Sequence, residues 1–151
     1  MFSKGKELII NTRHTGMVVR DLERSIRFYE AMGLAIWQRV KETGTFIDKV
    51  VGIPGVCLEW AKLKCPDDSL VELIQYHSHP DIHPLEKAPP NRLGCSHIAF
   101  TVHDVAQACD KIKQLGGAVV NPGAVASSGS VRVAYCHDPD GILIELVEEI
   151  L

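Results

Sequence analysis

Two stretches of the chain carry the same order of apolar and polar positions. Residues 14–35, HTGMVVRDLERSIRFYEAMGLA, and residues 97–118, HIAFTVHDVAQACDKIKQLGGA, align without a gap. Each begins with a short β-rich run and continues into a segment whose apolar residues recur every three or four positions. That spacing is typical of an amphipathic helix, whereas the first run favours a strand. The chain therefore contains an internal repeat of a strand followed by a helix.

The ends of both predicted helices carry ordinary helix signals. An aspartate, Asp21 or Asp104, precedes each helix, where its carboxylate can accept a hydrogen bond from a free backbone N–H group. A glycine follows each helix, at Gly33 and at Gly116, and glycine commonly ends helices. We therefore predict one helix in each repeat, between its aspartate and its glycine.

After each helix the pattern changes to that of β-strands. Runs of branched and aromatic residues predict strands at roughly 35–40, 56–63 and 69–76 in the first copy, and at 118–121, 131–136 and 142–148 in the second. The sequences PDD and DPDG mark the turns before the last strands. We predict an α+β fold of two tandem βαβββ modules, at 8–76 and 95–149, joined by a linker at 77–94 that is rich in proline and histidine.

Strand alternation places one histidine and one glutamate of each module on the same face of its sheet. The apolar residues of the strand at 97–102 can pack on the helix, which turns His97 to the opposite face. The same alternation in the last strand turns Glu145 away from the helix, and the repeat extends the argument to His14 and Glu72. Two such modules related by pseudo-symmetry would bring the four side chains together.

These four polar residues have the chemistry of a metal site. A carboxylate inside an apolar strand is costly unless it is paired or binds a metal. Two imidazoles and two carboxylates can chelate one divalent cation, such as Zn, Ni, Co, Mn or Fe, and leave coordination positions for water. The alternative is that His14 and His97 are hydrogen-bonded core residues and that Glu72 and Glu145 lie at the rim. The repeat-equivalent positions favour the metal site.

Composition and charge narrow the class of protein. The chain has 151 residues, 46% of them hydrophobic, and a net charge of −3, which suits one compact domain or two small modules. No basic excess indicates a nucleic-acid surface, and no apolar run approaches the roughly 20 residues of a membrane span. We identify no export signal in MFSKGKELII, and the five cysteines show no CxxC spacing, which argues against disulfides and a zinc ribbon. We therefore expect a cytoplasmic protein without nucleic-acid or membrane partners.

The order of these motifs resembles the vicinal oxygen chelate superfamily, also called the glyoxalase/bleomycin resistance/dioxygenase group. The matching segments are RHTGMVVRDLERSIRFYEAMGL, LVELIQY, SHIAFTVHDVAQACDKIKQLGG and AYCHDPDGILIELVEE, which together cover most of the chain. The resemblance implies paired modules that form an open sheet around a metal, with His14, Glu72, His97 and Glu145 as its ligands. It also implies a homodimer and a small-molecule substrate.

Within this superfamily the chain is similar to glyoxalase I and to methylmalonyl-CoA epimerase. Glyoxalase I usually carries an arginine four residues after its first ligand and an asparagine four after its second, which hold glutathione; here these positions are Val18 and Tyr76. The epimerase uses a glutamate on the third strand of its first module as an acid or base, and Glu59 falls near that position. The repeat aligns Glu59 with Arg132, so Glu59 is either a cavity base whose pKa depends on Arg132 and the metal, or an exposed strand residue.

The resemblance and the four ligands together predict metal-assisted proton transfer, as in a lyase, isomerase or epimerase. A substrate with two neighbouring oxygens, an α-hydroxycarbonyl or a thioester, would replace water on the metal, which would act as a Lewis acid. Glu145, Glu72 or Glu59 would move the proton next to the carbonyl. Two other functions stay open: an extradiol-type dioxygenase, which uses two histidines and one carboxylate on iron, and a non-catalytic antibiotic- or metabolite-binding resistance protein.

Overall fold

The first module folds into a four-stranded sheet with a helix packed on one face. In this computed structural model, which describes residue 5 and residues 7–150, its elements are β1 (Thr15–Val18), α1 (Leu22–Ala31), β2 (Ala35–Thr43), α2 (Thr45–Val51), β3 (Cys57–Lys64) and β4 (Leu70–Tyr76). The strand order is β1–β4–β3–β2, with β1 parallel to β4 and the other pairs antiparallel. The first and last strands of the module therefore lie side by side.

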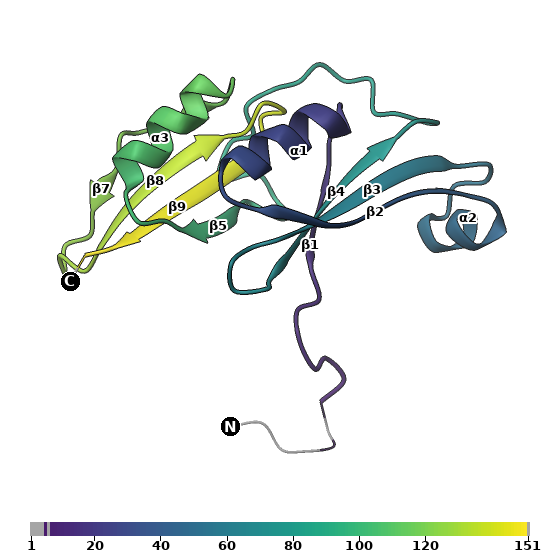
Figure 1. The fold of residues 1–151 in the computed structure, drawn as a ribbon, viewed down its shortest axis with the longest axis horizontal. Coiled ribbons are helices and arrows are strands. Elements are labelled where there is room, and N and C mark those ends of the chain that lie inside the picture. Colours follow the sequence, from purple (N-terminus) through teal and green to yellow (C-terminus); the bar gives the residue numbers. More distant parts are fainter. Residues whose placement is uncertain (1–4, 6, 151) are drawn as a thin grey trace.

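The second module repeats this arrangement. Its elements are β5 (Ile98–Thr101), α3 (Val105–Gln114), β6 (Ala118–Val119), β7 (Ala124–Val125), β8 (Val131–His137) and β9 (Leu143–Glu149). The strand order is β5–β9–β8–β6, again with the first strand parallel to the last, and β7 also pairs with β8. Figure 1 shows the two sheets side by side, with α1 and α3 on the same side of them. The predicted α+β fold with two open sheets is confirmed.

The predicted helix signals are confirmed in both modules. The carboxylates of Asp21 and Asp104 each accept a hydrogen bond from the backbone N–H three residues further on, at 3.0 and 2.8 Å. Each helix ends two residues before a glycine in the left-handed region, Gly33 with φ +109° and Gly116 with φ +87°. Glycine adopts this conformation without the steric cost of a Cβ atom, so both helices stop where the sequence indicates.

The helix α2 and the short strand β7 lie outside the predicted elements. α2 begins after Gly44, which has no side chain to cap it. Its residue Ile47 is buried against Val56 and Leu58, and the carboxylate of Asp48 accepts hydrogen bonds from the backbone N–H groups at positions 55 and 56. The burial of Ile47 and the hydrogen bonds of Asp48 hold the helix in place. Figure 1 shows α2 at the outer end of the first sheet.

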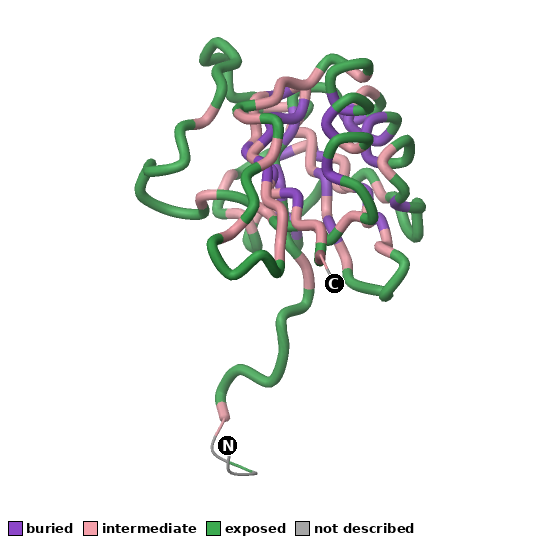
Figure 2. The backbone as a smooth tube through the Cα atoms, turned by 90° about the vertical axis from the view of Figure 1, so that its left-hand side faces the viewer, coloured by how far each residue is buried: buried purple, intermediate pink, exposed green. Residues whose placement is uncertain are grey.

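The larger of the two apolar clusters extends through both modules. It includes Leu22 and Phe28 of α1, Ile112 of α3, and residues of both sheets such as Leu73 and Leu146. Figure 2 shows the buried residues inside the body, whereas the exposed segment before β1 projects away from it. No helix among the described residues is long and apolar enough to cross a membrane.

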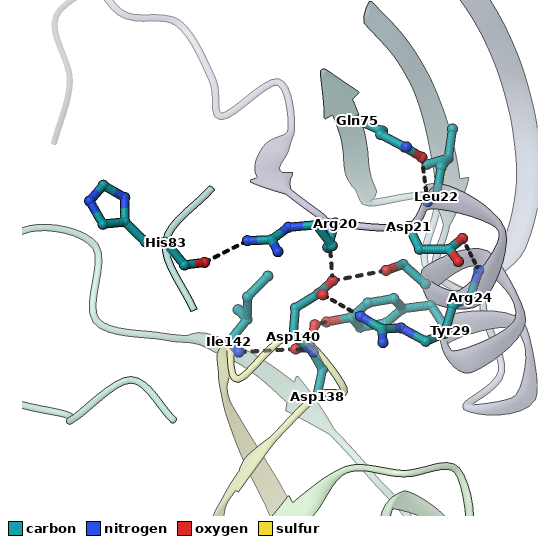
Figure 3. Close-up of polar contacts among 11 residues, drawn as sticks. Arg20, Asp21, Leu22, Arg24, Tyr29, Gln75, His83, Asp138, Asp140 and Ile142 are labelled. Atoms are coloured by element: carbon teal, nitrogen blue, oxygen red, sulfur yellow. Dashed lines mark hydrogen bonds and ion pairs between the residues drawn. The ribbon is translucent and has the colours of Figure 1, made fainter. Parts of the chain in front are cut away.

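Polar contacts also fix α1 to the turn between β8 and β9 (Figure 3). The hydroxyl of Tyr29 donates to Asp138 Oδ2 at 2.8 Å, and Ser25 Oγ donates to Asp140 Oδ2 at 3.2 Å. Arg24 forms an ion pair with the same Asp140 carboxylate, which is nearly completely buried. A buried carboxylate with partners from another module specifies one relative position of the two parts.

Candidate metal centre

The first candidate pair, His14 and Glu72, lies where β1 and β4 run side by side. His14 precedes β1 directly, and the register pairs Gly16 with Glu72. His14 Nε2 lies 3.7 Å from Glu72 Oε1, with the two side chains 30% and 13% exposed. The neighbours of Glu72 in β4, Val71 and Leu73, are buried in the core, so Glu72 projects from the face opposite to α1, as strand alternation predicts.

The second pair, His97 and Glu145, has the same construction. Ala99 pairs with Glu145 in β9, so each histidine lies two residues before the residue that pairs with its glutamate. His97 Nε2 lies 2.6 Å from Glu145 Oε2, and His97 Nδ1 lies 3.1 Å from Ser96 Oγ. The histidine ring also contacts the ring of Tyr135, with 5.2 Å between centroids. The repeat seen in the sequence is therefore reproduced as two equivalent His–Glu pairs.

Each pair fits one half of a metal site. Two ligands bound at right angles to one ion, each at about 2.1 Å, lie roughly 3.0 Å apart. The observed separations of 3.7 and 2.6 Å fall on either side of that value. Imidazole nitrogen with carboxylate oxygen is a donor set that suits Zn, Ni, Co, Mn and Fe. Each pair can supply two ligands to a divalent cation.

The two pairs do not combine into one site within the chain. Among the described residues, no group of three or more His, Cys, Asp or Glu side chains is arranged to hold a metal ion. His14 Nδ1 is buried and has no hydrogen-bond partner in the described part of the chain, although the second nitrogen of a metal-bound histidine almost always donates to an acceptor. The described part of the chain therefore presents two separate His–Glu pairs, each a half-site of the predicted four-ligand centre.

Glu59, the third carboxylate considered from the sequence, lies on the other face of the first sheet. It shares that face with Ala61 and Leu63, which pack in the core with α1. Its carboxylate accepts a 2.7 Å hydrogen bond from Arg39 Nε and lies 3.1 Å from His77 Nε2. These two hydrogen bonds, that of Arg39 first, lower the pKa of Glu59. Glu59 is thus separated from His14 and Glu72 by the sheet.

The expectation that Arg132 sets the pKa of Glu59 is wrong. Arg132 Nη1 lies 3.3 Å from the carboxylate of Glu148, on the neighbouring strand β9. Glu59 and Arg132 occupy equivalent positions of the two modules. The two modules form separate sheets, so residues at equivalent positions do not have to contact one another. The guanidinium beside Glu59 is that of Arg39 in β2.

Lys62, which the sequence analysis did not single out, and the aromatic residue Tyr135 stand beside the candidate ligands. Lys62 lies directly across from Glu72 in the β3–β4 pair, and Tyr135 lies directly across from Glu145 in the β8–β9 pair. Lys62 Nζ is 3.6 Å from Glu72 Oε2. The alignment of the modules that places Glu72 on Glu145 also places Lys62 on Tyr135, so the repeat contained the signal that would have found Lys62.

Comparison with known proteins identifies the family. The sequence matches the Glyoxalase/Bleomycin resistance protein/Dioxygenase superfamily over residues 12–146. It is 33% identical over 137 residues to lactoylglutathione lyase of Escherichia coli O157:H7, covering 90% of each chain. It is 30% identical to a probable lactoylglutathione lyase of Synechocystis, covering 89% of this chain and 92% of that one.

The solved structures agree with this result. The crystal structure of a glyoxalase family protein from Bacillus cereus superimposes with a TM-score of 0.89 at 30% identity, covering 99% of this chain and 100% of that chain. This protein therefore belongs to the glyoxalase/bleomycin resistance/dioxygenase superfamily, and the resemblance stated from the sequence motifs is confirmed.

Proposed function

We propose that this protein is a divalent-metal-dependent lyase or isomerase. Its substrate would be a small molecule that binds the metal through two neighbouring oxygens and loses a proton next to a carbonyl group. The observation that carries this proposal is the pair of repeat-equivalent His–Glu contacts, His14 with Glu72 and His97 with Glu145. Relatives about one-third identical along most of their length are named for lyase activity, which supports the same class of reaction.

We further propose that each metal ion is shared between two copies of the chain. His14 and Glu72 of one copy would bind it together with His97 and Glu145 of the other. A two-fold symmetric dimer uses each contact twice, so one dimer would contain two complete sites. The separation of the two half-sites within the chain supports this arrangement, as does the buried Nδ1 atom of His14 that has no partner in the described residues.

The four ligands would have different tasks during the reaction. The ion, when bound, supplies Lewis acidity that stabilises negative charge on a substrate oxygen. Glu145 is our choice for the group that takes the proton, because among the described residues its ion-pair contact is to His97 alone. Glu72 is held between His14 and Lys62 and is therefore the more firmly positioned carboxylate. A cytoplasmic site of action, where cysteine thiols stay reduced, completes the proposal.

A mixing experiment with two ligand variants tests the proposal. Glu72→Gln and Glu145→Gln proteins each lose one ligand from both sites of their own dimers, so each should bind cobalt(II) weakly. A dimer containing one chain of each variant has one intact site and one doubly altered site. After the chains are mixed and allowed to exchange, roughly a quarter of the wild-type metal content should return. Equilibrium dialysis of cobalt(II) would measure the recovery.

Controls distinguish a wrong ligand assignment from a metal site that is not shared between copies. Glu30→Gln changes an exposed carboxylate of α1 and should bind cobalt(II) as the wild-type protein does. Differently tagged chains would show that mixed dimers have formed. If mixed dimers form without any recovery, the metal is not shared between copies. If Glu72→Gln and Glu145→Gln bind metal as tightly as the wild type, the ligand assignment itself is wrong.

A further inference from the structure

Lys62 places a positive charge inside the proposed metal site. Its side chain is only 17% exposed, and its ammonium lies 3.6 Å from Glu72 Oε2. The ammonium also lies over the ring of Trp60, 4.7 Å from the centroid, where a cation–π interaction favours it. Lys62 is thus held on the same sheet face as Glu72 by its strand position and by its aromatic neighbour.

The partner of Lys62 is the residue that metal binding would engage. Among the described residues, Glu72 is the only carboxylate that forms an ion pair with Lys62. Once Glu72 serves as a metal ligand, its negative charge is shared with the cation and no longer balances the ammonium. The two carboxylates Glu72 and Glu145 together balance the charge of a divalent cation. The Lys62 ammonium would then lack a counter-charge in a half-buried site, where charges are screened less than at the surface. The loaded site therefore requires a further negative charge.

We propose that Lys62 binds an anionic group of the substrate. This inference rests on the proposed function, and it adds to it that the substrate carries a carboxylate besides the two oxygens that chelate the metal. Val18 and Tyr76 stand where glyoxalase I would carry its glutathione-holding residues, so a different charged handle is consistent with this chain. Lys62 would pair with that carboxylate and fix the orientation of the substrate on the metal.

The neighbouring Lys64 does not supply the same function. Its ammonium lies over the ring of Trp37 at 5.0 Å from the centroid, but it also pairs with Asp68 Oδ1 at 3.5 Å. Asp68 is an exposed turn residue with no part in the proposed site, so this ion pair can persist when a metal binds. One ammonium, that of Lys62, is left to balance one negative charge, which favours a carboxylate over a doubly charged phosphate.

Two chelators that differ by one carboxylate test the inference. 3-Hydroxy-4-pyrone binds metals through neighbouring oxygens, and 5-hydroxy-4-pyrone-2-carboxylate presents the same chelating oxygens with one added carboxylate. Both would be titrated into the cobalt(II)-loaded protein and followed by its visible spectrum. The wild-type protein should bind the carboxylate-bearing compound about tenfold more tightly than the other. Lys62→Met should abolish this preference, and Lys62→Arg should keep part of it.

A matched variant and a second measurement make the result decisive. Lys113→Met removes an exposed lysine of α3 and should keep the wild-type preference between the chelators. Lys62→Met should also bind cobalt(II) itself about threefold more tightly, because a repelling charge beside the ligands is gone. Weaker cobalt(II) binding by Lys62→Met would mean that Lys62 only supports Glu72, and that would overturn the inference.

The outcomes also distinguish this inference from the proposed function. Suppose that the wild-type protein binds cobalt(II) and that the loaded protein binds the two chelators equally tightly. The proposed metal site then stands and the role of Lys62 is refuted. The same holds if Lys62→Met keeps the wild-type preference for the carboxylate. If the wild-type protein binds neither cobalt(II) nor the chelators, the proposed function and this inference fail together.

Discussion

The hydroxyl of Tyr29 in the first module donates a 2.8 Å hydrogen bond to the carboxylate of Asp138 in the second. Both side chains are almost fully buried. The other carboxylate oxygen of Asp138 accepts hydrogen bonds from the backbone N–H groups of Asp140 and Ile142, each at 2.9 Å. The contact therefore ties α1 to the turn before β9, the strand that carries Glu145, and couples the position of one half-site to that of the other.

Replacing Tyr29 with phenylalanine should lower the free energy of unfolding by about 1–3 kcal/mol, because the variant leaves a buried carboxylate oxygen without its donor. Urea denaturation at a fixed protein concentration would measure the change. Tyr76→Phe is the matched control, since the Tyr76 hydroxyl has no hydrogen-bond partner among the described residues, and it should change stability little. Equal effects of the two substitutions would show that the Tyr29–Asp138 contact contributes nothing specific.

The same contact predicts a dependence of stability on pH. Burial raises the pKa of Asp138, and the Tyr29 hydrogen bond offsets this only in part. The native state therefore holds the Asp138 proton more tightly than the unfolded state, so this group stabilises the fold as the pH falls through its raised native pKa. Asp138→Asn removes the titration. The stability of wild type relative to Asp138→Asn should increase from pH 7 toward about pH 4.5. A relative stability that stays constant or falls would contradict the assignment.

Gly141 lies against the backbone of the linker, and this close packing predicts that a larger residue at this position destabilises the protein. A Cβ atom at Gly141 would lie 1.9 Å from the backbone oxygen of Glu86, and Ala88 N donates a 2.9 Å hydrogen bond to the Gly141 oxygen. Gly141→Ala should cost about 3 kcal/mol or more, because the linker backbone must move. Gly116 has nearly the same φ, +87° against +85°, but an added Cβ would meet nothing within 4 Å. Gly116→Ala should therefore cost only the roughly 1–2 kcal/mol of left-handed strain.

The sequence predicted those features that depend on local pattern and on the repeat. Helix caps at Asp21 and Asp104 follow from nearby backbone geometry, and strand alternation placed Glu72 and Glu145 on the faces away from the helices. The contact between Tyr29 and Asp138 could not be predicted, because it joins residues 109 positions apart. Its geometry depends on how the two modules pack, and no local pattern encodes that.

Glu59 and Lys62 show a second limit of the sequence analysis. The resemblance to an epimerase directed attention to Glu59, whereas the alternation of β3 places Glu59 on the face of Ala61 and Leu63 and places Lys62 beside Glu72. Strand alternation could have been applied to the segment that forms β3, and it would have placed Glu59 and Lys62 on opposite faces. The register between β3 and β4 could not be predicted in this way, because the turn between the two strands determines which residues lie opposite one another.

Glutamine substitutions at Glu145 and Glu59 compare the roles of the two carboxylates in turnover and in cobalt(II) binding. Glu145→Gln should lose turnover and weaken cobalt(II) binding by about tenfold or more, since a carboxamide is a poorer ligand and cannot take a proton. Glu59→Gln alters a carboxylate on the opposite face that contacts Arg39 and His77, so it should leave the cobalt(II) affinity unchanged and reduce stability slightly. Paired titrations and turnover assays would measure both. Full turnover in Glu145→Gln, or its loss in Glu59→Gln with metal binding intact, would move the proton-transfer role to another residue.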